Sequence, residues 1–209
     1  MSGLFITFEG GEGAGKSTVL SRINERLEKE GYDVLATREP GGSLIAEKIR
    51  QVILDPSHTE MDNRTEALLY AAARRQHLVE TVLPHLKKGG LVLCDRFVDS
   101  SLVYQGVARE IGVEDVRKIN LFATEGKLPD LTLFFDVAPE IGLARITSHD
   151  GREYNRLDRE SLKFHEQVRD AYHQLHNQEP ERIRMVDASY PLEKVMMETW
   201  EEIKQFIEG

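Results

Sequence analysis

The side chains of residues 10–17 point first to phosphate binding. This segment reads Gly-Gly-Glu-Gly-Ala-Gly-Lys-Ser and matches the pattern G-x-x-x-x-G-K-[ST]. Glycines let successive backbone N–H groups curl around phosphate oxygens, Lys16 can reach the terminal phosphates of a nucleotide, and the Ser17 hydroxyl can ligate Mg²⁺. We therefore expect a site for ATP with Mg²⁺. The expected ATP contacts are Gly10, Gly11, Glu12, Gly13, Ala14, Gly15, Lys16, Ser17 and Thr18.

A carboxylate that could serve the same metal is Asp95. It directly follows the apolar run Leu91–Cys94, and an acid at the carboxyl end of a strand beside a phosphate-binding loop is well placed for Mg²⁺. Position alone supports a strand-end turn residue equally well. The expected metal ligands are therefore Ser17 and Asp95, with Ser17 resting on the stronger signal.

Two arginines also stand close to the ends of apolar runs. Arg38 ends the segment that begins with Val34–Ala36, and Arg96 follows Asp95. Parallel sheets bind ligands at their carboxyl edge, and a guanidinium can hold a phosphate through two parallel hydrogen bonds. The pair could therefore hold a second phosphate, and each arginine by itself could equally be a structural ion pair.

Tyr70 and Arg74 are spaced to share one face of a helix. An aromatic ring beside a guanidinium could hold a nucleic-acid base by stacking and hydrogen bonding. A core tyrosine beside solvated Arg74 and Arg75 is the competing interpretation, and it is favoured when these residues are considered by themselves. The segment therefore indicates a base site only in combination with other motifs.

The most polar stretch, residues 148–159, reads SHDGREYNRLDR and offers almost nothing to bury. We expect a mobile surface loop that contains Arg152 and Arg156 and follows Arg145. The phosphate-binding loop has Gly13 where some related kinases place an arginine, so other cations would have to meet the charge on a transferred phosphoryl group. The loop arginines could supply them, and a solvated charged loop is the competing interpretation.

The apolar pattern predicts an α/β scaffold for these residues. Five short runs rich in Val, Ile, Leu and Phe are typical of strands buried on both faces of a parallel sheet. Amphipathic segments alternate with them, so we expect one three-layer domain with right-handed crossovers. The expected strands are Leu4–Phe8, Val34–Ala36, Leu91–Cys94, Leu131–Val137 and Ile183–Val186. The expected helices lie around 19–27 and 45–53 and over 63–88, 113–124, 140–147, 157–175 and 192–207.

Composition excludes several classes of protein. Hydrophobic residues make up 40% of the 209, which is enough for one core, and the formal net charge is −9. Such a chain repels nucleic acids and anionic membranes, so we expect neither as a partner. The single cysteine, Cys94, permits no intramolecular disulfide, and no signal peptide or membrane span is visible. We therefore expect a cytoplasmic protein.

In combination, the motifs resemble the thymidylate kinase family. The segments that carry the resemblance fall in the family's order and cover essentially the whole chain. They are Phe8-Glu9-Gly10 with Gly15-Lys16-Ser17, Arg38-Glu39-Pro40-Gly41-Gly42, Ala73-Arg74-Arg75-Gln76, Asp95-Arg96-Phe97, Ser100-Ser101, Tyr104-Gln105-Gly106 and Pro129-Asp130-Leu131. Gly13, together with arginines in residues 148–159, resembles the bacterial class of the family.

The resemblance implies a P-loop NTPase fold with a five-stranded parallel sheet, a lid at about 148–159 over ATP, and a homodimer. It implies ATP-dependent phosphorylation of dTMP to dTDP, a step in dTTP biosynthesis. It also implies that residues 1–209 form a single nucleoside-monophosphate-kinase domain. The catalytic residues that it implies are Lys16, Glu12, Arg96, Arg152 and Arg156.

The resemblance also assigns roles at the nucleoside of dTMP. Tyr70 would stack on thymine, and Arg74 would bond a carbonyl group of the base. Ser101 and Gln105 would contact the rest of the base edge. Tyr104 would crowd the 2′ position of the sugar and so disfavour a ribonucleotide.

A second set of implied roles concerns the phosphates. Arg96, with Arg50 and Arg38, would hold the acceptor phosphate. Glu12 would lie near the acceptor sugar and Mg²⁺. Arg145 would either touch the adenine of ATP or share the catalytic role of the lid arginines.

The chain departs from the family pattern at two places beside the expected acceptor site. Ser43-Leu44-Ile45-Ala46 replaces the usual Thr-Pro-x-Gly, and Glu110 stands where a glycine is usual.

The alternatives left open by the sequence are another pyrimidine nucleoside monophosphate kinase, a deoxynucleoside kinase, and an ATP-binding regulator without turnover. An adenylate-kinase-like chain is disfavoured, because it would carry Asp-Gly-Phe-Pro-Arg where this chain reads Cys94-Asp95-Arg96-Phe97.

Overall fold

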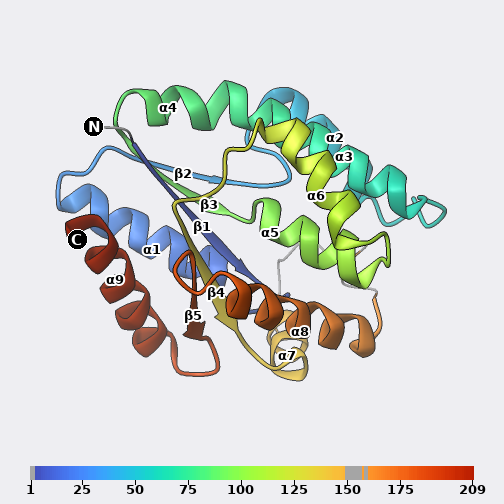
Figure 1. Cartoon of the computed structure of the whole chain (residues 1–209). Helices are drawn as coiled ribbons and strands as arrows, with labels where there is room; N and C mark the ends of the chain where they lie inside the picture. Colours follow the sequence, from blue (N-terminus) through green and yellow to red (C-terminus); the bar gives the residue numbers. More distant parts are fainter. Residues whose placement is uncertain (1–2, 149–156, 158–159) are drawn as a thin grey trace.

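A computed structural model describes residues 3–148, 157 and 160–209, which form a parallel five-stranded sheet with helices on both faces (Figure 1). The strand order is β2-β3-β1-β4-β5. The strands are β1 (Leu4–Gly10), β2 (Val34–Arg38), β3 (Leu91–Asp95), β4 (Leu131–Asp136) and β5 (Ile183–Asp187). Each strand overlaps one of the apolar runs that predicted it, so the predicted α/β architecture is confirmed.

The register of the central strands brings the candidate residues to one edge. β1 lies between β3 and β4, and Phe8 pairs with Asp95 on one side and with Leu133 on the other. Arg38 in β2 pairs with the same Asp95. Because all the strands run in parallel, the end of β2, the end of β3 and the loop after β1 therefore leave the sheet at the same edge.

Alternate residues of each central strand pack into two separate cores. Ile6 and Phe8 lie on the face that α1 (Lys16–Lys29) and α9 (Leu192–Glu208) cover. Phe5 lies on the opposite face and packs against side chains from the remaining helices. Figure 1 shows α1 and α9 side by side on one face and most other helices on the other. This is the three-layer arrangement expected for a sheet buried on both faces.

Most predicted helices form close to their expected positions. Along the described ranges, no helix combines the length and the apolar character that crossing a membrane requires. The helices other than α1 and α9 are α2 (Leu44–Leu54), α3 (Asn63–His77), α4 (Leu83–Lys87), α5 (Val98–Ser101), α6 (Val113–Thr124), α7 (Pro139–Thr147) and α8 (Leu162–Gln178). The described residues also include the π-helical segments η1 (Leu78–Val82) and η2 (Leu102–Ala108).

Three helical segments differ from the prediction. The expected helix over 63–88 is α3, η1 and α4 in succession, and Pro84 lies in the first turn of α4, where its missing N–H is tolerated. The expected helix over 157–175 begins only at Leu162, because Ser161 accepts a hydrogen bond from the Phe164 N–H at 3.2 Å and caps the helix. The helical segment 98–108 was not predicted, since polar residues of the site interrupt its apolar pattern.

The two departures from the family pattern have local structural consequences. Glu110 has φ of 58°, a left-handed conformation that costs an L-residue about 1–2 kcal/mol and that glycine adopts freely. This explains why a glycine suits the position. Ser43 precedes α2 without a side-chain capping bond, and among the described residues its buried hydroxyl has no hydrogen-bond partner. Glu47 instead accepts from the Gly42 N–H at 2.8 Å.

Candidate active site

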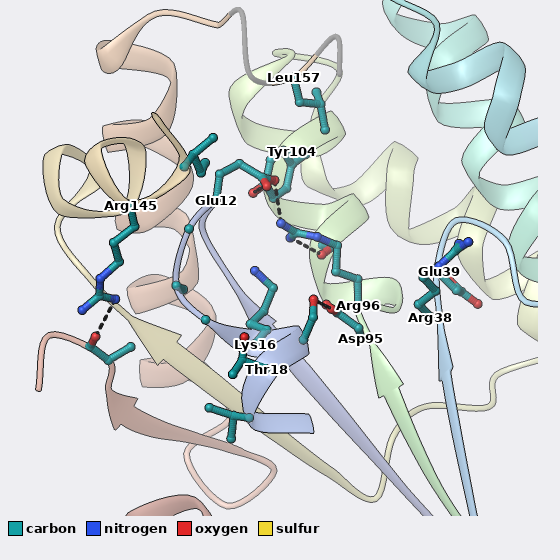
Figure 2. Close-up of a pocket in the computed structure, with 18 of the residues that line it drawn as sticks. Glu12, Lys16, Thr18, Arg38, Glu39, Asp95, Arg96, Tyr104, Arg145 and Leu157 are labelled. Atoms are coloured by element: carbon teal, nitrogen blue, oxygen red, sulfur yellow. Dashed lines mark hydrogen bonds and ion pairs between the residues drawn. The ribbon is translucent and has the colours of Figure 1, made fainter. Parts of the chain in front are cut away.

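A cavity of about 770 Å³ opens at the carboxyl edge of the sheet (Figure 2). Its walls come from the β1–α1 loop, the ends of β2 and β3, α2, α3, α5, η2, α7 and the loop between β5 and α9. Open α/β sheets bind ligands at this edge, and the volume suits small organic ligands. Segments far apart in the sequence therefore contribute side chains to one site.

The β1–α1 loop has the backbone conformation of an anion site. Gly13 and Gly15 have φ of 70° and 85°, and a Cβ on Gly13 would collide with the backbone of Gly142 in α7. Gly15 precedes the first turn of α1, so the positive end of this helix faces the cavity. The loop therefore presents backbone N–H groups and a helix N-terminus to an anion, as phosphate binding requires.

Lys16 lies inside this loop and is only 6% exposed. Its Nζ donates to the carbonyl oxygens of Gly10 at 3.1 Å and Gly11 at 2.8 Å. Burial lowers the pKa of Lys16 to about 8, and the nearby guanidinium of Arg96 acts in the same direction. A phosphate beside Nζ would favour the protonated form, so binding of an anionic ligand would raise the pKa of Lys16.

Ser17 and Asp95 form an oxygen pair beside Lys16. The Ser17 hydroxyl donates to Asp95 Oδ2 at 2.6 Å, which joins the first turn of α1 to the end of β3. Mg²⁺ prefers oxygen ligands and commonly takes one or two from the protein, with water and phosphate oxygens completing its octahedron. No group of three His, Cys, Asp or Glu side chains at metal-binding geometry occurs in the part of the chain that the structure describes. The pair therefore fits Mg²⁺ bound together with a nucleotide.

Arg96 and Glu12 form an ion pair beside the β1–α1 loop (Figure 2). Arg96 Nη2 lies 2.6 Å from Glu12 Oε1, and Nη1 donates to the Gly10 carbonyl at 3.0 Å. The Tyr104 hydroxyl also donates to Glu12 at 3.2 Å. Burial would lower the pKa of Arg96, but Tyr104, Glu12 and Asp95 outweigh it and hold this pKa well above its usual value. The guanidinium is therefore a fixed, positioned charge.

Two further arginines meet at the loop after β2. Arg38 Nη1 and Arg50 Nη1 donate to the same Pro40 carbonyl oxygen, at 2.9 Å and 3.1 Å. Glu47 pairs with Arg38 at 3.1 Å. Both arginines line the cavity together with Arg96. Three guanidinium groups that line one cavity can hold a dianionic phosphate through charge-assisted hydrogen bonds.

Arg74 lies at the end of the cavity near α3 and is 2% exposed. Its Nε lies 2.7 Å from Glu39 Oε2, Nη1 donates to Ser101 Oγ at 2.9 Å and also to Asn120, and Nη2 donates to the Phe97 carbonyl at 2.8 Å. The alternative interpretation of Arg74 as a solvated arginine is therefore wrong. It does hold for Arg75, which pairs with the exposed Glu125.

Comparisons with known proteins decide which family these features belong to. A family model for thymidylate kinase matches residues 8–199. The chain is 59% identical over 198 residues to a thymidylate kinase of Bacillus pumilus, which covers 95% of this chain and 93% of the relative. It is 54% identical over 209 residues to one of Geobacillus sp., which covers both proteins completely. The chain belongs to the thymidylate kinase family.

A solved structure supports the same assignment at the level of the fold. The crystal structure of thymidylate kinase from Ehrlichia chaffeensis matches 98% of this chain and 99% of its own, with a TM-score of 0.77 and 28% identity. The resemblance inferred from the motifs and the predicted P-loop NTPase fold are thus confirmed. The activity expected from the sequence, ATP-dependent phosphorylation of dTMP to dTDP, follows from membership in the family.

Most of the site residues that were predicted from the sequence line the cavity. Arg152 and Arg156 lie outside the described residues. Gly10 and Gly11 do not line the cavity, because their carbonyls turn toward Lys16 instead. The predicted site residues that line it are Glu12, Gly13, Ala14, Gly15, Lys16, Ser17, Thr18, Arg38, Arg50, Tyr70, Arg74, Asp95, Arg96, Ser101, Tyr104, Gln105 and Arg145.

Arg145 lies on the other side of Lys16 from Glu39, the ion-pair partner of Arg74, as Figure 2 shows. It extends from α7, and its Nη1 donates to the Ala188 carbonyl at 2.9 Å (Figure 2). Tyr190 and Leu192, in the segment before and at the start of α9, line the cavity nearby, and sequence reasoning missed both. They follow the last strand without any motif, so no sequence signal pointed to them.

Sequence reasoning also missed the role of Glu9. Its buried carboxylate accepts from the Phe97 N–H at 2.7 Å, the Ser100 hydroxyl at 2.5 Å and the Tyr172 hydroxyl at 2.7 Å. Burial, with Asp99 nearby, raises the pKa of Glu9. These bonds hold the turn in which Arg96 adopts a φ of 70°. A carboxylate inside an otherwise apolar strand was the signal that could have revealed it.

Proposed function

We propose that ATP and dTMP bind in this one cavity and that the γ-phosphoryl group passes in line between them, close to Lys16 and Arg96. The observation that carries the proposal is the order of groups along the cavity. Figure 2 shows Lys16 and Arg96 between Arg145 on one side and Glu39, the ion-pair partner of Arg74, on the other. Two nucleotides that meet through their phosphates require such an order.

Thymine would occupy the end of the cavity at α3 and η2. Tyr70 is 9% exposed and would stack on the base, and Arg74 would donate to a carbonyl of the base with its remaining N–H. Ser101 and Gln105 would contact the rest of the base edge. Tyr104, which is held by Glu12, would crowd the 2′ position of the sugar.

The acceptor phosphate would lie against Arg96, Arg38 and Arg50. Arg96 needs no rearrangement for this role, because Glu12 and the Gly10 carbonyl already orient its guanidinium. Glu12 would act in catalysis through this pairing and through its position near the acceptor sugar. A preorganised cation stabilises the charge that collects during transfer without the cost of reorienting solvent.

The donor would be held by the backbone of residues 12–15 and by Lys16, with Arg145 toward its adenine. Ser17 and Asp95 would hold Mg²⁺, which would neutralise part of the charge on the phosphates of ATP. We also propose that residues 1–209 form one domain with residues 148–159 as its lid. Arg152 and Arg156 would act from that lid on the transferring phosphoryl group.

The test of this proposal is an acceptor panel. ADP release with Mg²⁺-ATP would be measured for dTMP, dUMP, UMP, CMP, AMP and thymidine. We expect dTMP to give the highest kcat/KM. Thymidine should be at least about tenfold poorer, because it leaves Arg96, Arg38 and Arg50 without the phosphate that offsets their desolvation. Phosphorylation of thymidine as efficient as that of dTMP would identify a nucleoside kinase, and bound ATP without ADP release would identify a regulator.

The lowered pKa of Lys16 predicts that ATP affinity depends on pH. Lys16 loses its proton as pH rises through about 8, whereas phosphate binds the protonated form more tightly. Raising the pH from 7.5 to 9 should therefore weaken ATP binding by about five- to tenfold. Titration calorimetry in two buffers of different ionisation enthalpy would measure the affinity and proton uptake near pH 9. An affinity that is constant over this range, without proton uptake, would contradict the assignment.

We also propose that the protein is a homodimer. Large apolar side chains on α3 and α6 are exposed: Leu68 at 56%, Leu121 at 59% and Phe122 at 88%. These helices pack together next to α2, as Figure 1 shows. Large exposed apolar side chains on helices that pack together are typical of a protein interface. Sedimentation velocity would test the proposal, and a monomer at micromolar concentration would contradict it.

The cytoplasm is the compartment that we propose. The only cysteine, Cys94, is buried, and burial raises the pKa of its thiol well above the usual value. The protein therefore needs no oxidising environment to fold. Fractionation of the source cells would test this location.

A further inference from the structure

A buried carboxylate lies directly behind one of the proposed thymine contacts. Glu66, in α3, has no exposed surface, and its Oε1 accepts a hydrogen bond from Gln105 Nε2 at 2.8 Å. Gln105, in η2, is 2% exposed and lines the cavity. Arg109 lies behind this pair, with its Nε 3.3 Å from the same Glu66 oxygen. The proposed base site therefore has a second layer of charged groups.

The chemistry of these groups determines which way the Gln105 amide faces. An ionised carboxylate can only accept hydrogen bonds, so Glu66 requires the NH₂ group of Gln105 on its side. The amide oxygen must then point away from Glu66, and among the described residues no group donates to it. Gln105 therefore offers the cavity an acceptor.

Arg109 places a positive charge 3.3 Å from Glu66, which favours the carboxylate form that this orientation requires. Burial would lower the pKa of Arg109, but the facing carboxylates of Glu66 and Glu160 hold it above the usual value. The guanidinium thus remains charged and offsets the desolvation of Glu66. Its other partner, Glu160, lies 2.6 Å from Nη2 and does not contact Gln105 or Glu66 in the described hydrogen bonds.

We propose that Glu66 determines pyrimidine specificity by forcing Gln105 to present an acceptor to N3 of the base. Thymine and uracil carry a proton on N3, which the Gln105 oxygen can accept. Cytosine carries a lone pair on N3, so the site would oppose two acceptors in a buried place, which is strongly unfavourable. Glu66 is thus a positioning residue, and the inference rests on the proposed binding of dTMP at this end of the cavity.

The experiment compares kcat/KM for dTMP, dUMP and dCMP in the wild type and in Glu66→Gln. A glutamine at position 66 can donate or accept, so it no longer forces the Gln105 amide into one orientation. We expect the dTMP/dCMP ratio to fall by about 10- to 100-fold. The dTMP/dUMP ratio should stay within about twofold, because these bases share the same hydrogen-bonding edge and differ only in a methyl group.

Two further variants distinguish a changed orientation of the Gln105 amide from general damage to the base pocket. Glu160→Gln removes the other carboxylate that faces Arg109 and does not touch Gln105, so it should leave both ratios unchanged. The exchange Glu66→Gln with Gln105→Glu restores an acceptor toward the base, because the new glutamine donates to the new carboxylate. It should recover the preference for dTMP over dCMP.

The outcomes are decisive in either direction. A dTMP/dCMP ratio in Glu66→Gln within about twofold of wild type would overturn the inference. An equal fall in both ratios would also overturn it, because that pattern indicates a loosened pocket. If Glu66→Gln does not fold, the exchange variant Glu66→Gln with Gln105→Glu is the test. Equal kcat/KM for dTMP and dCMP in that variant would reject the inference. Absence of dTMP turnover in the wild type would instead refute the proposed function.

Discussion

Replacing Lys16 with alanine is expected to lower kcat by about 10³-fold or more. The ammonium group is the cation that the β1–α1 loop itself contributes to the cavity, and it lies beside the Ser17–Asp95 pair. Negative charge on the transferring group reaches its maximum in the transition state, so the loss should fall mainly on kcat. Steady-state kinetics with dTMP and ATP varied separately would measure it.

The fold should survive this substitution. Among the described residues, Lys16 donates hydrogen bonds to the carbonyls of Gly10 and Gly11 alone, and the apolar core under α1 does not include it. We expect far-UV circular dichroism to be unchanged. Lys29→Ala, an exposed position at the end of the same helix, is the matched control and should keep wild-type kinetics. Wild-type turnover by Lys16→Ala would refute the role of the loop.

The strands could be predicted from the sequence because their signal is local. A strand buried on both faces must be apolar throughout, and the runs at Leu4–Phe8 and Leu131–Val137 meet this condition without help from distant residues. The order of the strands could not be predicted in the same way. It depends on pairings such as Phe8 with Asp95 and with Leu133, which join residues far apart in the chain.

The same difference applies to the site: features that depend on consecutive residues were predictable, and features that depend on distant partners were not. The loop at residues 10–17 was predictable because its chemistry lies in consecutive residues. The burial of Arg74 was not, because its partners Glu39 and Asn120 come from a strand-end loop and another helix. Glu9 and Glu66 were missed for a related reason. Each acts by orienting a second residue, and that role has no pattern of its own in the sequence.

Replacing Arg152 or Arg156 with alanine is the second change for which we expect a large loss. In the proposed complex, the described arginines that line the cavity already have other roles: Arg96, Arg38 and Arg50 at the acceptor phosphate, Arg74 at the base, and Arg145 beside the Ala188 carbonyl. Position 13 cannot supply another, because a side chain there would collide with Gly142. A further cation for the transferring phosphoryl group must therefore come from elsewhere.

Residues 149–156 are the segment that we expect to supply that cation, because the residues on both sides of it in the chain line the cavity. They lie in the chain between Ile146 and Leu157, and both of these residues line the cavity. An arginine that reaches the phosphates only when a lid closes acts mainly on the transition state. Such an arginine can contribute about 10³–10⁵ in rate, so a fall of this order in kcat is expected for at least one of the two variants, with a much smaller rise in KM for dTMP.

The measurement is steady-state kinetics of Arg145→Ala, Arg152→Ala and Arg156→Ala, with ATP and dTMP varied separately. Arg145→Ala distinguishes the two roles left open for that residue. A higher KM for ATP with little change in kcat indicates adenine contact, and a lower kcat indicates a share in phosphoryl transfer. Lys163→Ala, an exposed position in α8 shortly after residues 148–159 in the chain, is the control and should match wild type. Wild-type kcat in all three arginine variants would mean that residues 148–159 are a solvated loop, because loss of a transition-state cation must appear in kcat.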